Sequence, residues 1–215
     1  DNLVKLWDVA TGKEMQTILG HTGPALGVAI APDNRTIISS SADKSIRIST
    51  LGVTKLYLGH AGAVNGLALI ANGSQFISAG ADATLKLWDV AQGTQIRNFA
   101  GHAGPVLSLA LSADGQKLAS GSADKTAKVW NVANGQPIAN LAGHEGPIQS
   151  VRFNVEATRV LTGGADQTLR IWDAASGKQL RSIAAHSGAV TSVLPQANNT
   201  RVITAGADKT VKLWE

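Results

Sequence analysis

Cysteine is absent from this chain of 215 residues, and methionine occurs once. The lack of cysteine excludes disulfide bonds and thiolate metal sites, but it does not identify a cellular compartment. No run of apolar residues approaches the ~18 that a membrane-spanning helix needs, so we expect no membrane segment. The sequence begins at Asp1, without an initiator Met or the pattern of a signal peptide. We interpret it as an excised segment or a processed form, and its localisation is unknown.

Charge of one sign is only slightly in excess, because 19 basic and 15 acidic residues give a net charge of +4. A basic balance hints at an anionic partner such as nucleic acid. However, basic residues recur at a regular interval, for example at Lys86, Lys128 and Arg170, rather than gathering in one patch. Aromatic residues, which would stack on bases, make up only 4% of the chain. Nucleic-acid binding is therefore disfavoured.

A repeat dominates the sequence. Each of five units opens with Gly-His or a close relative, and a closing position that is usually Trp follows 28 residues after the histidine. The histidines are His21, His60, His102, His144 and His186. The closing residues are Ser49, Trp88, Trp130, Trp172 and Trp214. Such a fixed spacing indicates a structural repeat.

Within a unit, short apolar runs are separated by turns that contain Asp or Gly. In the third unit these runs are Val106–Leu111, Leu118–Ser122 and Ala127–Trp130. The pattern predicts a three-stranded antiparallel meander. A further run follows the closing position, as at Glu14–Leu19, and predicts a fourth strand. We therefore expect an all-β fold built from four-stranded antiparallel units.

The first complete unit differs from the others. Its strands are expected at Ala25–Ile30, Thr36–Ser40 and Ser45–Ser49, and Ser49 stands where the other units have Trp. The loop after it is shorter, since the next histidine follows after 11 residues instead of 14. The first turn of each unit needs a residue that tolerates a left-handed conformation, for which Ala157 is the strained exception. These turn residues are Asn34, Gly73, Gly115, Ala157 and Asn199.

The two ends of the chain resemble each other. Residues 1–8 match residues 208–215 almost residue for residue. We therefore expect the chain to start at the third strand of a unit and to end on the same strand.

Units of this size cannot bury both faces of a sheet alone, so they must stack, and radial stacking makes a propeller. The Gly-His openings, the closing Trp-Asp pairs such as Trp88-Asp89, and the strand–turn pattern resemble the WD-repeat β-propeller family. The resemblance covers the whole chain and implies a single propeller domain or segment of WD-type four-stranded antiparallel blades. A partial blade would occupy residues 1–19, and five repeats would start near residues 20, 59, 101, 143 and 185.

The family's usual seven blades would need more residues than the 215 of this chain. Two arrangements are open: an arc of a larger ring, or a closed five-bladed ring in which Glu14–Leu19 is the outer strand of the last blade. We favour the arc, because the chain starts in mid-blade and ends where family members commonly end. An arc would allow assembly with missing blades or with another copy.

Each unit also carries a polar quartet of His, Ser or Thr, Asp and Trp. Ser, His and Asp together suggest nucleophilic catalysis, but a catalytic triad occurs once, whereas this set recurs in every unit. The resemblance implies a structural relay, in which the indole N–H donates to the hydroxyl, the hydroxyl bonds the histidine and the histidine bonds the aspartate. The complete quartets are His60, Ser78, Asp82, Trp88; His102, Ser120, Asp124, Trp130; His144, Thr162, Asp166, Trp172; and His186, Thr204, Asp208, Trp214. The degenerate quartet is His21, Ser39, Asp43, Ser49.

The quartets use all five histidines of the chain, so none is free to serve as a general base or a metal ligand. No carboxylate cluster has metal-ligand spacing, and no glycine-rich loop has the context of a phosphate site. We expect no catalytic residue, no metal and no cofactor.

In this family partners often dock at the mouth of the central channel, which two positions per blade line. One position lies five residues after the histidine, at Leu26, Asn65, Leu107, Gln149 and Thr191. The other precedes the turn aspartate, at Ala42, Ala81, Ala123, Ala165 and Ala207. The alanines offer neither charge nor an aromatic anchor. Two interpretations are open: this face binds nothing tightly, which is slightly favoured, or it is a shallow mouth with Leu26 and Leu107 as its apolar contacts.

The leading hypothesis for function is a non-catalytic protein–protein interaction scaffold whose partner the sequence does not identify. The first alternative is a nucleic-acid-associated basic propeller module, whose binding would depend steeply on salt. The second is a regulatory or interaction domain of a longer enzyme, which the sequence upstream of Asp1 would test.

Overall fold

The computed structural model describes residues 2–7, 12, 14–32, 36–50, 53–71, 73–197 and 200–215. Within these ranges the chain forms strands β1 to β21 and no helix, so the all-β prediction is confirmed. The described part includes no helix of the length and hydrophobicity that would cross a membrane. The turn residues Asn34 and Asn199 lie outside the described residues.

The strands pair into antiparallel sheets, four of which have four strands. The first two of these contain β3 (Ala25–Ile30), β4 (Ile37–Ser41), β5 (Ser45–Thr50), β6 (Val53–Leu58), and β7 (Val64–Leu69), β8 (Gln75–Gly80), β9 (Thr84–Asp89), β10 (Gln95–Ala100). The next two contain β11 (Val106–Leu111), β12 (Lys117–Ser122), β13 (Thr126–Asn131), β14 (Pro137–Ala142), and β15 (Ile148–Phe153), β16 (Arg159–Gly164), β17 (Thr168–Asp173), β18 (Gln179–Ala184).

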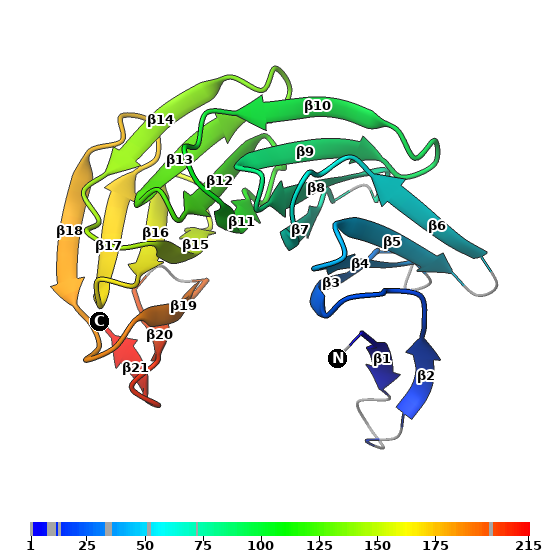
Figure 1. Ribbon diagram of the computed structural model, residues 1–215. Coiled ribbons are helices and arrows are strands. Elements are labelled where there is room, and N and C mark those ends of the chain that lie inside the picture. Colours follow the sequence, from blue (N-terminus) through cyan, green and yellow to red (C-terminus); the bar gives the residue numbers. More distant parts are fainter. Residues whose placement is uncertain are drawn as a thin grey trace.

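Smaller sheets lie at the two ends of the chain. One pairs β1 (Val4–Trp7) with β2 (Glu14–Ile18), and the other contains β19 (Val190–Pro195), β20 (Val202–Gly206) and β21 (Val211–Trp214). Figure 1 shows the sheets following one another around an open arc, with β3, β7, β11 and β15 innermost and β6, β10, β14 and β18 outermost. The prediction of blades in an arc is confirmed. The alternative of a closed five-bladed ring is wrong for this structure, because β2 pairs with β1 and not with β21.

The hydrophobic core lies between neighbouring sheets. Trp88, Trp130 and Trp172 are all buried, and each packs with residues of more than one sheet. The outer strands contribute directly: the ring of Tyr57 on β6 lies 5.8 Å from that of Trp88 on β9, and the ring of Phe99 on β10 lies 6.0 Å from that of Trp130 on β13. Burying such large rings stabilises the junction between sheets.

Side chains at the ends of the arc are more exposed than their equivalents in the middle. On β3, Leu26, Val28 and Ile30 alternate outward with 46%, 58% and 53% of their surface exposed. On β21, Val211 and Leu213 are likewise exposed. The sheet before β3 has only the strands β1 and β2, and no described strand follows β21, so neither position is covered by a four-stranded sheet.

Candidate functional site

The quartet of the third unit forms a continuous chain of hydrogen bonds. Trp130 Nε1 donates to Ser120 Oγ at 2.8 Å, and Ser120 Oγ lies 2.8 Å from His102 Nε2. The other ring nitrogen, His102 Nδ1, lies 2.8 Å from Asp124 Oδ2. The hydroxyl and the imidazole are fully buried. These hydrogen bonds therefore give the buried polar side chains of this quartet their partners and join β12, β13 and the loop before β11.

The same geometry recurs in the other complete quartets. Hydroxyl–imidazole distances are 2.7 Å for Ser78 and His60, 2.7 Å for Thr162 and His144, and 2.8 Å for Thr204 and His186. Each indole nitrogen donates to its hydroxyl at 2.8 Å. Each aspartate lies within 3.0 Å of the histidine Nδ1.

A fifth polar position, which sequence reasoning missed, completes each quartet. Thr126 Oγ1 donates to Asp124 Oδ1 at 2.7 Å, and the Thr126 amide donates to the same oxygen at 2.8 Å. The signal was present in the sequence, because Ser or Thr stands two residues after every turn aspartate. The residues at this position are Ser45, Thr84, Thr126, Thr168 and Thr210.

Electrostatics fix the protonation states along the chain. Burial would raise the pKa of Asp124, but hydrogen bonds from Thr126, from the Ala103 amide and from His102 outweigh it and lower the pKa to about 2. Burial lowers the pKa of His102 below its usual value, and the Asp124 carboxylate opposes this only in part. At neutral pH the ring is therefore neutral, its Nδ1–H donates to Asp124, and its Nε2 accepts the Ser120 hydroxyl proton.

This arrangement is poorly suited to nucleophilic catalysis. Ser120 has no exposed surface, and its oxygen already contacts the indole and imidazole nitrogens. A substrate carbonyl could not approach it without displacing one of those partners. Within the described residues, no group of three or more His, Cys, Asp or Glu could hold a metal ion.

The degenerate quartet retains part of the chain. His21 Nε2 lies 2.9 Å from Ser39 Oγ, and His21 Nδ1 lies 3.1 Å from Asp43 Oδ2. Ser49 does not replace the indole donor, because its buried hydroxyl makes no hydrogen bond. The guanidinium of Arg47 lies against Gly20, where Trp88 lies against Gly59 and Trp130 against Gly101 in the next units. The side chain of Arg47 therefore takes up space that the missing indole would fill, and its buried Nε has no partner.

The predicted mouth residues share a structural cause. In each inner strand the register shifts across one residue, so that Asn65 lies between the paired residues Val64 and Gly66, and Leu107 lies between Val106 and Ser108. Leu26, Gln149 and Thr191 are skipped in the same way. A residue inserted in a β-bulge leaves the ladder, and its side chain is re-aimed. The bulge therefore explains why the side chain five residues after each histidine is directed away from the strand ladder of its blade.

Four of the mouth residues line one pocket, which we call the inner pocket. Its volume is about 210 Å³, and it includes Asn65, Leu107, Gln149 and Thr191 from the four inner strands β7, β11, β15 and β19. Leu26 does not belong to it, and instead lines a separate pocket of about 260 Å³ between β1 and β3. None of the five alanines before the turn aspartates lines the inner pocket.

Sequence reasoning missed a charged residue of the inner pocket, Arg152 on β15. Its Nη1 donates to the Val151 carbonyl at 2.8 Å, so the guanidinium is held close to the strand. The equivalent residue, eight positions after the histidine, is Ala29, Ala68, Ala110 or Leu194 in the other units. A comparison of units would have identified the arginine as an exception on an otherwise apolar position.

Comparisons with known proteins agree with this geometry. The family described as WD domain, G-beta repeat, matches residues 12–48, 52–89, 93–131, 135–173 and 177–215. A curated relative, "Protein tipD" of Dictyostelium discoideum, is 27% identical over 95 residues, a stretch that covers 43% of this chain and 16% of the relative. Repeats of this kind characterise protein-interaction scaffolds. The five repeat matches span most of the sequence, and each contains the outer strand of one sheet followed by three strands of the next sheet, so the chain belongs to the WD-repeat family.

Proposed function

We propose that this chain is a non-catalytic scaffold that binds a protein partner at the inner pocket. The observation that carries the proposal is the convergence of four bulge residues, Asn65, Leu107, Gln149 and Thr191, on one pocket. Each comes from a different blade, so a partner that fills the pocket contacts four blades at once. An apolar group surrounded by polar side chains is the usual composition of a binding patch.

The chemistry of the pocket suggests what the partner presents. Leu107 supplies an apolar contact, while the amides of Asn65 and Gln149 supply donors and acceptors. One amide is already engaged, because Asn65 Nδ2 donates to the Val106 carbonyl at 2.8 Å. Arg152 adds a positive charge, and no described carboxylate lies within ion-pair distance of it. A partner with an apolar side chain near an acidic one would match this set.

The absence of accessible reactive groups in the quartets supports the non-catalytic part of the proposal. The four residues that carry the quartet hydroxyls have no exposed surface: Ser78, Ser120, Thr162 and Thr204. They satisfy neighbouring donors and acceptors instead of facing solvent.

The substitution Leu107→Glu tests the proposal. It places a carboxylate in the apolar centre of the pocket and should abolish capture of the partner that the unaltered chain retains. Leu180→Glu is the matched control, because Leu180 is 50% exposed on the outer strand β18. Unchanged capture by Leu107→Glu, or equal loss with Leu180→Glu, would place the contact elsewhere.

A further inference from the structure

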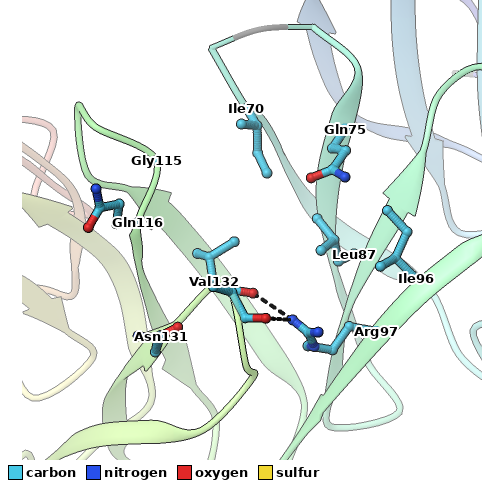
Figure 2. A pocket seen from close by; sticks show the side chains of 10 residues that line it. Ile70, Gln75, Leu87, Ile96, Arg97, Gly115, Gln116, Asn131 and Val132 are labelled. Atoms are coloured by element: carbon cyan, nitrogen blue, oxygen red, sulfur yellow. Dashed lines mark hydrogen bonds between the residues drawn. The ribbon is translucent and has the colours of Figure 1, made fainter.

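A second recess lies between two neighbouring blades, away from the inner pocket. It separates the sheet β7–β10 from the sheet β11–β14 and has a volume of about 420 Å³. Its apolar lining includes Ile70, Leu87, Ile96 and Val132, as Figure 2 shows. These residues belong to the ends of the strands opposite to the quartet histidines. We call this recess the inter-blade groove.

The groove is open because of one side chain. Gln75 is the first residue of β8, and its equivalent in the next unit is Lys117, the first residue of β12. Lys117 Nζ crosses to the following blade and donates to the Ala157 carbonyl at 3.1 Å. Gln75 is shorter, and its side chain makes no such bond to Gly115, the equivalent of Ala157, within the described part of the chain. Gln75 therefore does not make the cross-blade contact that Lys117 makes at the next junction.

The wall of the groove carries a positive charge. Arg97 on β10 reaches across to the next blade, where its Nη1 donates to the carbonyls of Val132, at 2.9 Å, and Ala133 (Figure 2). No described carboxylate lies within 4.0 Å of its guanidinium. The Nε and Nη2 donors of the guanidinium are not used in these two bonds. The equivalent residue is Ala139 on β14 and Arg181 on β18. Among these three described positions, only Arg97 is seen donating to carbonyls of the following blade.

We propose that the inter-blade groove binds an extended segment of a protein partner that carries an apolar side chain and a carboxylate two residues apart. In an extended segment, side chains two residues apart point to the same side. The apolar side chain enters between Ile70, Ile96 and Val132, and the carboxylate accepts hydrogen bonds from Arg97. Charge-assisted bonds of this kind are the strong ones, and the volume lies within the range of ligand sites, roughly 300–1,000 Å³.

The groove is a surface separate from the inner pocket, so its test is independent of the proposed function. The probe is the acetylated peptide amide Ala-Leu-Ala-Glu-Ala, titrated into the full chain while the methyl resonances of Ile96 and Val132 are followed by NMR. Saturable shifts with a dissociation constant near ~1 mM or tighter are expected. The peptide Ala-Leu-Ala-Gln-Ala should bind at least ~10-fold more weakly, because it lacks the charge that Arg97 recognises. Absence of saturation at about 5 mM, or equal binding of the two peptides, would overturn the proposal.

Two variants locate the binding. Gln75→Lys should close the groove with an amine placed as in Lys117 and should abolish the shifts while Arg97 is retained. Arg97→Gln should weaken the Glu peptide to the level of the Gln peptide. Arg181→Gln is the matched control, because Arg181 holds the same position on β18 as Arg97 on β10, and the substitution removes the same charge. If Gln75→Lys binds the peptide as tightly as the unaltered chain, the groove is not the site.

The two proposed surfaces can fail separately. Leu107→Glu should leave peptide binding at the inter-blade groove unchanged, and Gln75→Lys should leave capture at the inner pocket unchanged. Loss of both activities in either variant would contradict their independence.

Discussion

Removing one hydroxyl from a complete quartet should cost more than removing it from the degenerate quartet. Ser120→Ala deprives two buried groups of their partner, Trp130 Nε1–H and His102 Nε2. Ser39→Ala deprives only one, His21 Nε2, because Ser49 replaces the indole. Both serines are almost fully buried, so water cannot readily replace the lost partner.

The magnitudes follow from the number of groups left without a partner. A buried polar group that loses its hydrogen bond costs about 1–3 kcal/mol. We therefore expect Ser120→Ala to lower the free energy of unfolding by about 2–6 kcal/mol and Ser39→Ala by about 1–3 kcal/mol.

Native-state hydrogen exchange along a urea series is the appropriate assay, because repeat arrays open in parts and a single global transition is not assured. The amides of β12 report on Ser120→Ala, and those of β4 report on Ser39→Ala. Equal costs for the two substitutions would refute the reasoning, since they would mean that the indole bond contributes nothing to the stability of its blade.

Three further predictions follow. Strands β4 and β5 should exchange faster than β12 and β13, because the first blade lacks the buried indole; equal or greater protection there would show that repacking around Arg47 replaces it. Stability should fall as the pH drops below about 6.5 and again below about 4. The reason is that folding lowers the pKa values of three buried histidines and of the quartet aspartates, so the unfolded chain binds more protons than the folded one. A urea midpoint that is constant from about pH 7.5 to about pH 5.5 would contradict this. Gly115→Ala should cost about 1 kcal/mol in urea unfolding, because Gly115 has a φ of +69°, while the nearest side-chain atom, 3.5 Å from an added Cβ, is at ordinary contact distance. Ala157→Gly, at a φ of +53°, should change stability by less than this, because relief of the backbone strain is offset by the loss of a methyl group that packs in the core.

The strands of the third unit show how far the sequence determines this fold. The predicted run Val106–Leu111 has the observed bounds, and the predicted Leu118–Ser122 is one residue shorter than β12. Turn residues with Asp and Gly mark where a strand must stop, so they locate strand ends well. The length of the chain left an arc and a closed five-bladed ring open, and the arc was favoured because residues 1–8 match the third strand of a unit, with which the chain also ends.

Features that depend on strand register or on side-chain packing between elements could not be predicted in this way. The bulge at Leu107 requires knowledge of strand register, and the open groove at Gln75 requires knowledge of what Lys117 does at the next junction. Arg47 is a further case, since its sequence position suggests a surface cation while its guanidinium lies against Gly20. Sequence patterns describe each strand by itself, whereas these features depend on how one element pairs with or packs against another.

The pairing of aromatic residues across blades defines which piece of this protein can be duplicated or transplanted intact. A cut between sheets would separate Tyr57 from Trp88 and Phe99 from Trp130, because each pair joins an outer strand to the following blade. The family repeats at residues 52–89 and 93–131 instead keep each pair together, since a repeat begins with the outer strand of one blade and ends at the Trp of the next. An inserted copy of such a segment would bring both partners of its own junction, so a propeller of this kind can be lengthened by one repeat without leaving an indole unmatched.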